Sequence, residues 1–425
     1  MSTLSATTDS TGALPPVPLR QDAGVIGLVG LAHMISHFSQ LLLAPLFPWL
    51  KDAFNASYTE LGFLMTIFFV VSCGVQAASG FLVDKYGPRP ILFAGLSLLG
   101  VAAFGFAMSP SYWTMACFSV VAGIGNGVFH PVDYTLLNRK ISPARLGHAY
   151  SFHGITGSLG WALAPAVMVP IAIAVSWQAA LMTAGTLAFV VLGVLWLNRS
   201  KLDLPLAAAR KAEVAAQGKG PAPAATGEGN FDFLRIPAVW MCFSFFFFYA
   251  VVLSAIQAFA PTAAHFLHGV PLTLAAMCLT VYMVLSAGGM VVGGFLASDP
   301  ARCERVVGMG FGAAALIALW IALGPVPAMA VPALFGAMGF ASGLAGPSRD
   351  LLVKRSTPEN ATGRVYGIVY SGLDIGQALA PLFFGALMDH QQYRGVWLGL
   401  VFMQAVLITS AFNVRKVRRT VALTP

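Results

Sequence analysis

Long apolar stretches alternate with short polar connections along almost the whole chain. Twelve of these stretches can each supply the roughly 20 residues that an α-helix needs to cross the hydrocarbon core of a membrane. They lie at 24–49, 60–83, 89–108, 112–138, 147–172, 176–197, 236–266, 272–297, 303–323, 327–354, 361–388 and 393–414. This pattern predicts an all-α membrane protein with twelve transmembrane helices.

The chain also contains an internal repeat. Residues 131–165 align without a gap to residues 347–381, at an offset of 216, and ten of the 35 aligned positions are identical. Two upstream glycine pairs agree as well, Gly123 with Gly339 and Gly127 with Gly343. Because the offset is half the chain, we predict two pseudo-symmetric six-helix bundles with a binding site between them, as in transporters built from parallel repeats.

These observations divide the chain into five parts. We predict a disordered cytoplasmic tail over 1–22, a first six-helix bundle over 23–197 and a second over 236–415. A polar segment rich in Ala, Gly and Pro at 198–235 is predicted to be a cytoplasmic linker, and 416–425 a second cytoplasmic tail.

Charge indicates how the chain lies in the membrane. Apolar residues make up 57% of the chain and charged residues 9%, against about 25% charged residues in soluble domains. With a cytoplasmic N-terminus, 22 of the 24 Lys and Arg fall on the cytoplasmic side, and only Lys51 and Arg394 fall outside. The positive-inside rule therefore predicts cytoplasmic termini in a bacterial inner membrane. The net charge of +8 then faces anionic lipid and does not indicate nucleic acid.

Motifs for enzymatic chemistry are missing from the sequence. It contains no phosphate-binding loop with Lys-Ser/Thr, no His-Glu-x-x-His and no Gly-x-Ser-x-Gly. The five cysteines form no close pair, and neither they nor the methionines show metal-ligand spacing. We therefore expect no catalytic residues, no cofactor and no metal site.

Polar residues inside the apolar stretches are the candidates for a functional site, because such groups are costly at membrane depth unless they face a cavity or a partner. His33 and His37 are four residues apart and share one helix face. Asn126, His130 and Asp133 can likewise share one flank of the fourth span. The alternative for a histidine is a bond to a backbone carbonyl, and for Tyr249 ordinary packing. The candidates for the cavity are His33, His37, Gln40, Asn126, His130, His153, Tyr249 and Gln257.

Some of these groups could carry a coupling proton. Histidine titrates near physiological pH, which makes His33 and His37 candidates. Asp374 lies in the middle of the eleventh span and is a third candidate. A structural hydrogen bond from Asp374 to the second or tenth span is the alternative.

A charge pair is predicted at symmetry-related positions. Arg349 is the repeat partner of Asp133, and both lie toward the cytoplasmic ends of their spans. We expect them to pair when the cytoplasmic side closes and to separate when it opens. Alternatively, each bonds to nearby loops, with Arg349 paired to Asp350.

The sequence GFLVDKYGPRP at 80–90 connects the second and third spans. It resembles the signature loop of the major facilitator superfamily, with a glycine, an aspartate four residues later, a glycine three residues after that, and then a basic region. A weaker copy, GFL, follows the eighth span at 294–296. The resemblance implies that Gly80, Asp84, Gly87 and Arg89 help to hold the cytoplasmic side in one of two states. A charged turn that only orients the loop is the alternative.

The fourth span narrows the resemblance. The sequence GIGNGVFHP at 123–131, together with His153-Gly154 and His33, resembles the fosmidomycin-resistance branch of the superfamily. Ser119 departs from this pattern, because many proton antiporters carry an arginine there, and Ala164 stands where antiporters have a glycine before proline.

The resemblance implies a monomeric secondary transporter that works by alternating access. Its expected cargo is a small polar or anionic solute, and its expected activity is proton-coupled efflux of a toxic compound or drug. The alternatives are proton-coupled uptake of an organic acid, an amino-acid-like nutrient or a metal complex, and, from another class, a non-transporting receptor.

Overall fold

The structure is a computed structural model that describes residues 18–142, 145–204, 237–296, 303–356 and 362–423. The predicted N-terminal tail up to residue 17 and most of the predicted linker lie outside these residues. Within them, twelve helices are long and apolar enough to cross a membrane. Each of the twelve overlaps one of the predicted spans, so the predicted all-α fold class is confirmed.

The first half contains residues up to Leu202. Its helices are α1 (Leu19–Gln40), η1 (Ala44–Leu46), α2 (Phe47–Phe54), α3 (Tyr58–Tyr86), α4 (Pro88–Ala107), α5 (Tyr112–Asn126), α6 (Phe129–Lys140), α7 (Leu146–Ala174), α8 (Trp177–Leu197) and η3 (Arg199–Leu202). The second half contains α10 (Pro237–Ala258), α11 (Ala260–His268), α12 (Leu272–Leu296), α13 (Cys303–Leu323), η6 (Ala328–Ala330), α14 (Val331–Ser356), α15 (Thr362–Asp389) and α16 (Tyr393–Leu423).

Two helix ends differ from the predicted boundaries. Helix α1 begins at Leu19, inside the predicted tail, because Asp22 is buried and accepts hydrogen bonds from the Ser142 hydroxyl and the Arg145 guanidinium, each at 2.6 Å. Helix α16 continues to Leu423, through most of the predicted C-terminal tail.

Several helices begin at a serine that the sequence places in a polar turn. Ser57, Ser111 and Ser176 each accept a hydrogen bond from a backbone N–H in the first turn of α3, α5 and α8. These caps satisfy N–H groups that have no partner inside the helix. Ser57 forms a full capping box with Glu60.

The fourth span is broken between Asn126 and Phe129, where α5 ends and α6 begins. Pro131 explains the break, because proline cannot donate to the carbonyl four residues earlier and its ring clashes with that carbonyl. The freed carbonyl is that of Gly127, and the Ser79 hydroxyl donates to it at 3.4 Å. The break sets the direction in which Asn126 and His130 point.

The repeat seen in the sequence is also present in the packing. A Cβ built at Gly160 on α7 would collide with the backbone of Met34 on α1, and one at Gly376 on α15 would lie 2.5 Å from the Phe247 carbonyl oxygen on α10. In the same way, Gly123 and Gly127 lie against α3, while their partners Gly339 and Gly343 lie against α12. Equivalent glycines therefore permit equivalent close helix crossings in both halves.

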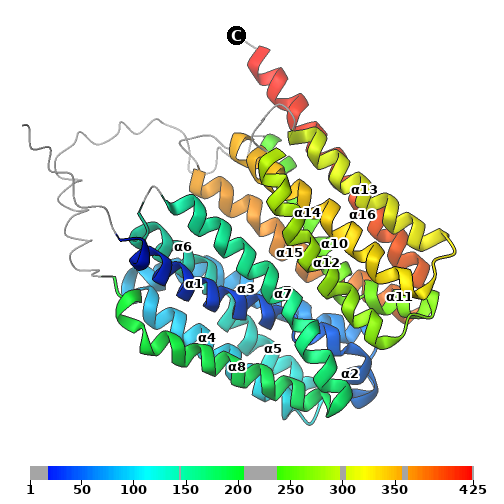
Figure 1. The fold of residues 1–425 in the computed structure, drawn as a ribbon, viewed down its shortest axis with the longest axis horizontal. Coiled ribbons are helices and arrows are strands. Elements are labelled where there is room, and N and C mark those ends of the chain that lie inside the picture. Colours follow the sequence, from blue (N-terminus) through cyan, green and yellow to red (C-terminus); the bar gives the residue numbers. More distant parts are fainter. Residues whose placement is uncertain (1–17, 143–144, 205–236, 297–302, 357–361, 424–425) are drawn as a thin grey trace, which may run out of the picture.

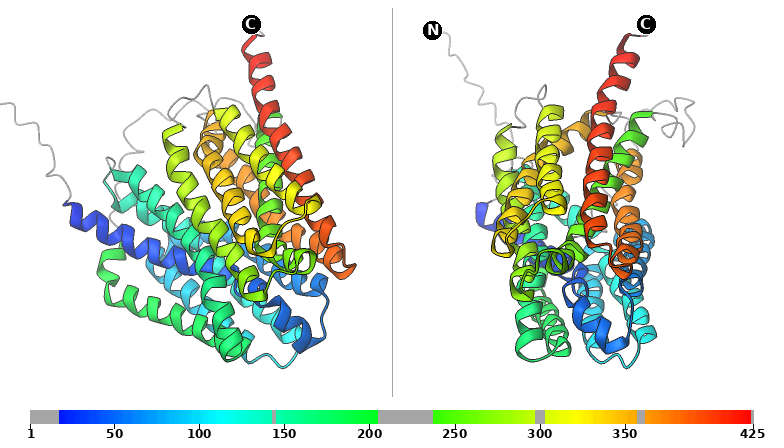
Figure 2. Two further views of the ribbon diagram at one scale, coloured as in Figure 1. Left: turned by 45° about the vertical axis from the view of Figure 1, so that its right-hand side comes forward. Right: turned by 90° about the vertical axis from the view of Figure 1, so that its right-hand side faces the viewer.

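The two halves form separate bodies, one coloured blue to green and the other green to red (Figures 1 and 2). Helix α3 of the first half packs on α15 of the second, and α7 packs on α12. We call the membrane side where Arg89, Lys140 and Arg145 emerge the basic face, and the side of Lys51 and Arg394 the opposite face.

Contacts between the halves are concentrated toward the opposite face. There the Thr66 hydroxyl donates to the Ala378 carbonyl at 2.5 Å, and a Cβ built at Gly62 would lie 2.7 Å from the Pro381 carbonyl oxygen. Toward the basic face, a Cβ built at Gly80 on α3 or at Gly294 on α12 would meet none of the described atoms within 4 Å. In this conformation the halves are closed at the opposite face and separate toward the basic face.

Candidate functional site

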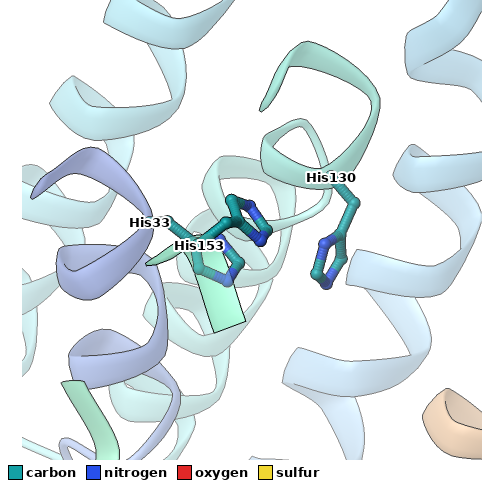
Figure 3. A group of neighbouring side chains, drawn as sticks. All are labelled: His33, His130 and His153. Atoms are coloured by element: carbon teal, nitrogen blue, oxygen red, sulfur yellow. The ribbon is translucent and has the colours of Figure 1, made fainter. Parts of the chain in front are cut away.

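Four histidines from three spans meet inside the first half. The rings of His33 and His153 stack with centroids 3.5 Å apart, and the His37 ring lies 4.3 Å from His33. The His130 centroid is 5.4 Å from that of His33 and 6.2 Å from that of His153 (Figure 3). The structure therefore brings together the four histidines that the sequence placed in the cavity, which we call the histidine cluster.

Asp133 orients two of these rings. Its carboxylate is fully buried, and the Oδ2 atom lies 3.1 Å from Nδ1 of His33 and 3.1 Å from Nε2 of His153. An ionised carboxylate only accepts hydrogen bonds, so opposite the Asp133 anion each of these ring nitrogens would carry the proton. The other nitrogen of each neutral ring then holds a lone pair. The carboxylate thus sets the tautomers of His33 and His153.

Asn126 links α1, α3 and α5 next to the cluster. Its Oδ1 atom accepts from the Ser36 hydroxyl at 2.7 Å and from Nε2 of Gln40 at 3.3 Å, and its Nδ2 donates to the Ser72 hydroxyl at 2.8 Å. Gln40 in turn accepts from the indole N–H of Trp161 at 2.9 Å. The predicted residues Asn126 and Gln40 therefore belong to a second polar network, which touches the histidine cluster through the ring of Trp161 next to His37.

Two contributors to this network escape sequence reasoning. Trp161 lies 4.3 Å from the His37 ring, and Ser72 is a partner of Asn126. Trp161 looks like an ordinary apolar residue of the fifth span. The one sequence signal for its place near α1 is that it directly follows Gly160, where α7 and α1 cross closely. Glycine at 157 leaves room for the cluster, because a Cβ there would lie 2.8 Å from Nδ1 of His37 and 3.0 Å from Nε2 of His33.

The predicted residues of the second half lie apart from the cluster. The guanidinium carbon of Arg349 lies 4.5 Å from the centre of the Tyr249 ring and 5.4 Å from that of Phe246. Gln257 is buried, and neither of its amide atoms has a hydrogen-bond partner among the described residues. Gln257 lines a pocket between the halves together with Pro45 and Pro165 of the first half.

The predicted pair of Asp133 and Arg349 is not formed between these described side chains in this conformation. Asp133 Oδ2 contacts His33 and His153, and Oδ1 has no hydrogen-bond partner within the described part of the chain. The basic face is the open side here, so pairing on closure stays a prediction. The side chain of Asp350, the alternative partner of Arg349, lies outside the described residues.

Asp374 on α15 contacts α3 of the first half, across the interface between these two helices, which we call the seam. Nε2 of Gln76 on α3 donates to its Oδ2 at 3.4 Å. This hydrogen bond to the second span is the alternative to proton coupling predicted from the sequence. Asp374 lies between the closed contacts of α3 at Thr66 and the open end at Gly80, where a change of charge would act on the seam directly.

The loop after the second span has the backbone that its glycines require. Gly87 ends α3 with a φ of 89°, a conformation that other residues rarely adopt. Arg89 pairs with Asp203 at 2.5 Å on the basic face. A Cβ at Gly80 would meet none of the described atoms within 4 Å in this conformation, and the side chain of Asp84 lies outside the described residues.

The sequence profile of the Major Facilitator Superfamily matches residues 29–337 and 303–423, which together span most of the chain. The chain belongs to the major facilitator superfamily. It is therefore a member of a transporter family and not an enzyme, as the sequence predicted.

Individual relatives match the chain over shorter stretches. An uncharacterized transporter of Bacillus subtilis, YfnC, is 29% identical over 144 residues, 34% of this chain and 35% of that protein. The fosmidomycin resistance protein of Escherichia coli is 26% identical over 146 residues, 34% of this chain and 36% of that protein. The chain thus matches about a third of the length of these relatives. A crystal structure of a bacterial homolog of the human lysosomal transporter Spinster, inward-facing and occupied, matches 95% of this chain and 98% of that one, with a TM-score of 0.73 and 14% identity.

Proposed function

We propose that this chain is a secondary active transporter that exports a small polar or anionic solute by alternating access, driven by protons. The observation that carries the proposal is the histidine cluster with the neighbouring Asn126 network, which buries many polar groups at membrane depth inside the first half. Such groups are costly in a membrane unless they serve a path or a partner. The similarity to the fosmidomycin resistance protein supports export of a toxic compound.

The solute path is proposed to use residues of both halves. His33, His37, His130 and His153 contact the solute from the first half, with Gln40 and Asn126 behind them. In the second half, Gln257 offers an amide with both of its polar atoms unpartnered among the described residues. Tyr249 lies under the Arg349 guanidinium, and this cation supports binding of an anionic group.

We assign the coupling proton to Asp374. Its carboxylate lies on the seam between α3 and α15, the helix pair whose separation changes when the halves rock. Loss of its charge on protonation would weaken its contact with Gln76 and favour movement of the seam. A carboxylate that gains and loses a proton in the two states couples the gradient to the conformation.

The positive-inside rule supports a cytoplasmic position for the basic face in a bacterial inner membrane. With this orientation the described conformation is open to the cytoplasm. It is the state that an exporter needs to load its solute.

The test uses fosmidomycin as the probe in cells that express the chain. We expect less retained fosmidomycin than in cells without the chain, and more retained probe when a protonophore collapses the gradient. Asp374→Asn should behave like the protonophore, whereas Asp52→Asn, at an exposed position on the opposite face, should not. Retention unaffected by the chain, by the protonophore and by Asp374→Asn would contradict the proposal.

Uptake of an organic acid is the second candidate. The observation that favours it is Arg349 above Tyr249 in the second half, since a guanidinium binds a carboxylate as readily as a phosphonate. The same measurement separates the two directions, because uptake predicts less retained probe when the gradient collapses.

A further inference from the structure

Three histidines of the cluster satisfy the distance requirement for a shared metal ion. His33, His130 and His153 each offer one ring nitrogen, and these nitrogens all lie within 4.8 Å of one another. They come from α1, α6 and α7 and point toward a common region (Figure 3). Sequence spacing gave no sign of a metal site, because each residue lies on a different helix.

The tautomers set by Asp133 make two of the rings ready to act as ligands. His33 donates through Nδ1 and His153 through Nε2 to the same carboxylate oxygen, so the remaining nitrogen of each ring carries the lone pair. Metal-binding histidines almost always donate their other N–H to a carboxylate or carbonyl in this way. A metal ion bound by these rings would use the nitrogens that do not face Asp133, with Asp133 as the hydrogen-bond partner of the other two.

His130 supplies the third nitrogen. Its Nδ1 atom is buried and has no hydrogen-bond partner among the described residues. An unpartnered ring nitrogen inside a membrane protein is costly, and a bound cation would remove that cost. The adjacent Tyr134 ring is stacked on His130 and is 45% exposed. His130 therefore lies at the edge of the cluster, beside an exposed side chain.

The type of ion follows from the ligands. Imidazole nitrogen suits zinc, copper, iron and nickel, whereas magnesium prefers oxygen ligands. The charge of Asp133, 3.1 Å from two of the rings, favours a cation over an anion at this point. Around a zinc ion, nitrogen ligands about 2.0–2.1 Å from the metal lie roughly 3.3 Å apart. The ring nitrogens, up to 4.8 Å apart, therefore need to close by up to about 1.5 Å, and the stacked rings of His33 and His153 must turn toward the ion.

We propose that His33, His130 and His153 bind a divalent transition-metal ion and that the ion forms part of the transported solute. Three protein nitrogens leave one position of a tetrahedral ion open, as in sites that bind a substrate oxygen. A carboxylate, phosphonate or similar oxygen of the solute takes this position. The inference rests on the proposed transport function and specifies its cargo as a small anion that chelates a transition metal.

The first experiment measures metal binding. The purified full-length chain is stripped with a chelator and titrated with zinc chloride in a calorimeter. We expect saturable binding of about one ion per chain, no comparable binding of magnesium, and loss of the zinc signal in His130→Ala and His153→Ala. His148→Ala is the matched control, since His148 is exposed on the same helix as His153.

Asp133→Asn tests the orienting carboxylate. Removing such a partner typically weakens metal binding 10–100-fold, and we expect a loss in that range. Equal zinc binding by the wild type and by the His130 and His153 variants would overturn the inference. X-ray absorption of the zinc-loaded wild type identifies the atoms that bind the ion and does not depend on how the variants fold. A zinc ion without imidazole ligands would also overturn the inference.

The second experiment distinguishes the cargo from the carrier function. Proteoliposomes are assayed for fosmidomycin exchange with and without zinc, and zinc-dependent exchange that is lost in His130→Ala supports the inference. Exchange that continues at the same rate without metal overturns the metal-bound cargo and leaves the proposed function standing. Absence of exchange under all conditions, with zinc bound at the three histidines, contradicts the proposed function and keeps the metal site.

Discussion

The carboxylate of Asp389 accepts two hydrogen bonds from Thr59, one from the backbone N–H at 2.9 Å and one from the hydroxyl at 2.6 Å. The two residues are 330 positions apart and belong to different halves. A third hydrogen bond comes from the backbone N–H of Tyr58 at 2.6 Å. Asp389, at the end of α15, therefore caps the first turn of α3, where a negative charge is favourable. This contact closes the halves at the opposite face.

Asp389→Asn should favour the conformation that opens to the opposite face. The substitution removes the charge from three cross-half hydrogen bonds but keeps the size of the side chain. Loss of a helix cap costs about 0.5–2 kcal/mol, so we expect a shift of up to about 30-fold in the ratio of the two conformations. Distances between spin labels at Asp52→Cys and Arg394→Cys, in a chain without its native cysteines, measure the shift.

Glu60→Gln is the matched control. Glu60 lies in the same first turn of α3, but its carboxylate accepts from the backbone N–H of Ser57 in its own half. It should leave the distance distribution unchanged. A distribution that responds equally to both substitutions would show that the cap itself, and not the contact between the halves, sets the conformation.

Gly157→Ala should impair solute binding without unfolding the protein. A methyl group there would lie 2.8 Å from Nδ1 of His37 and 3.0 Å from Nε2 of His33, so both rings must move. Overpacking of this kind costs about 1–3 kcal/mol, which corresponds to a loss of roughly 5–150-fold in apparent affinity. The KM of exchange in proteoliposomes and the thermal midpoint in detergent measure the two effects.

Gly154→Ala provides the comparison on the same helix. A Cβ at Gly154 would meet none of the described atoms within 4 Å, and alanine favours a helix over glycine by about 1 kcal/mol. This variant should retain its KM. An increase in KM for Gly154→Ala as large as that for Gly157→Ala would mean that helix stiffness, and not the histidine rings, determines affinity.

The architecture was largely predictable because it depends on local sequence properties. The length of each apolar stretch determines whether it can cross the membrane, and repeated glycines such as Gly160 and Gly376 mark equivalent crossings. The break near Pro131 likewise follows from a local property, the chemistry of proline. The predicted helix ends were less accurate where a distant partner decides them. Ser142 and Arg145 bind Asp22 in the first turn of α1, and these contacts are not visible in the local sequence.

The site was predictable in its members but not in its connections. Membrane depth and residue type alone identified His33, His130 and His153. Asp133, whose carboxylate contacts His33 and His153, was instead predicted to pair with Arg349, because the repeat aligned the two positions. The structure shows that a contact within one half engages Asp133 in this conformation. Helix rotation and crossing geometry decide such partners, and a single sequence does not contain them.

Pro131→Ala should shift His130 more than Pro347→Ala shifts its surroundings, although the two prolines are repeat partners. The fourth span breaks between α5 and α6, whereas α14 continues through Pro347. Alanine at 131 restores the hydrogen bond to the Gly127 carbonyl and allows α5 and α6 to join. We expect transport to fall at least tenfold for Pro131→Ala and less than threefold for Pro347→Ala. Equal losses would indicate that both prolines act as general packing residues.

Asn126→Ala should destabilise the protein because Asn126 is the partner of three polar side chains. Its removal leaves the hydroxyls of Ser36 and Ser72 and the Gln40 amide without this partner. A buried polar group that loses its partner costs about 1–3 kcal/mol. Ser119→Ala on the same helix is the control, since the Ser119 hydroxyl is buried without a hydrogen-bond partner among the described residues. Thermal unfolding in detergent should therefore show a lower midpoint for Asn126→Ala and an unchanged or higher one for Ser119→Ala. If both variants unfold at the wild-type temperature, the Asn126 network does not stabilise the first half, and its polar groups are free to bind solute.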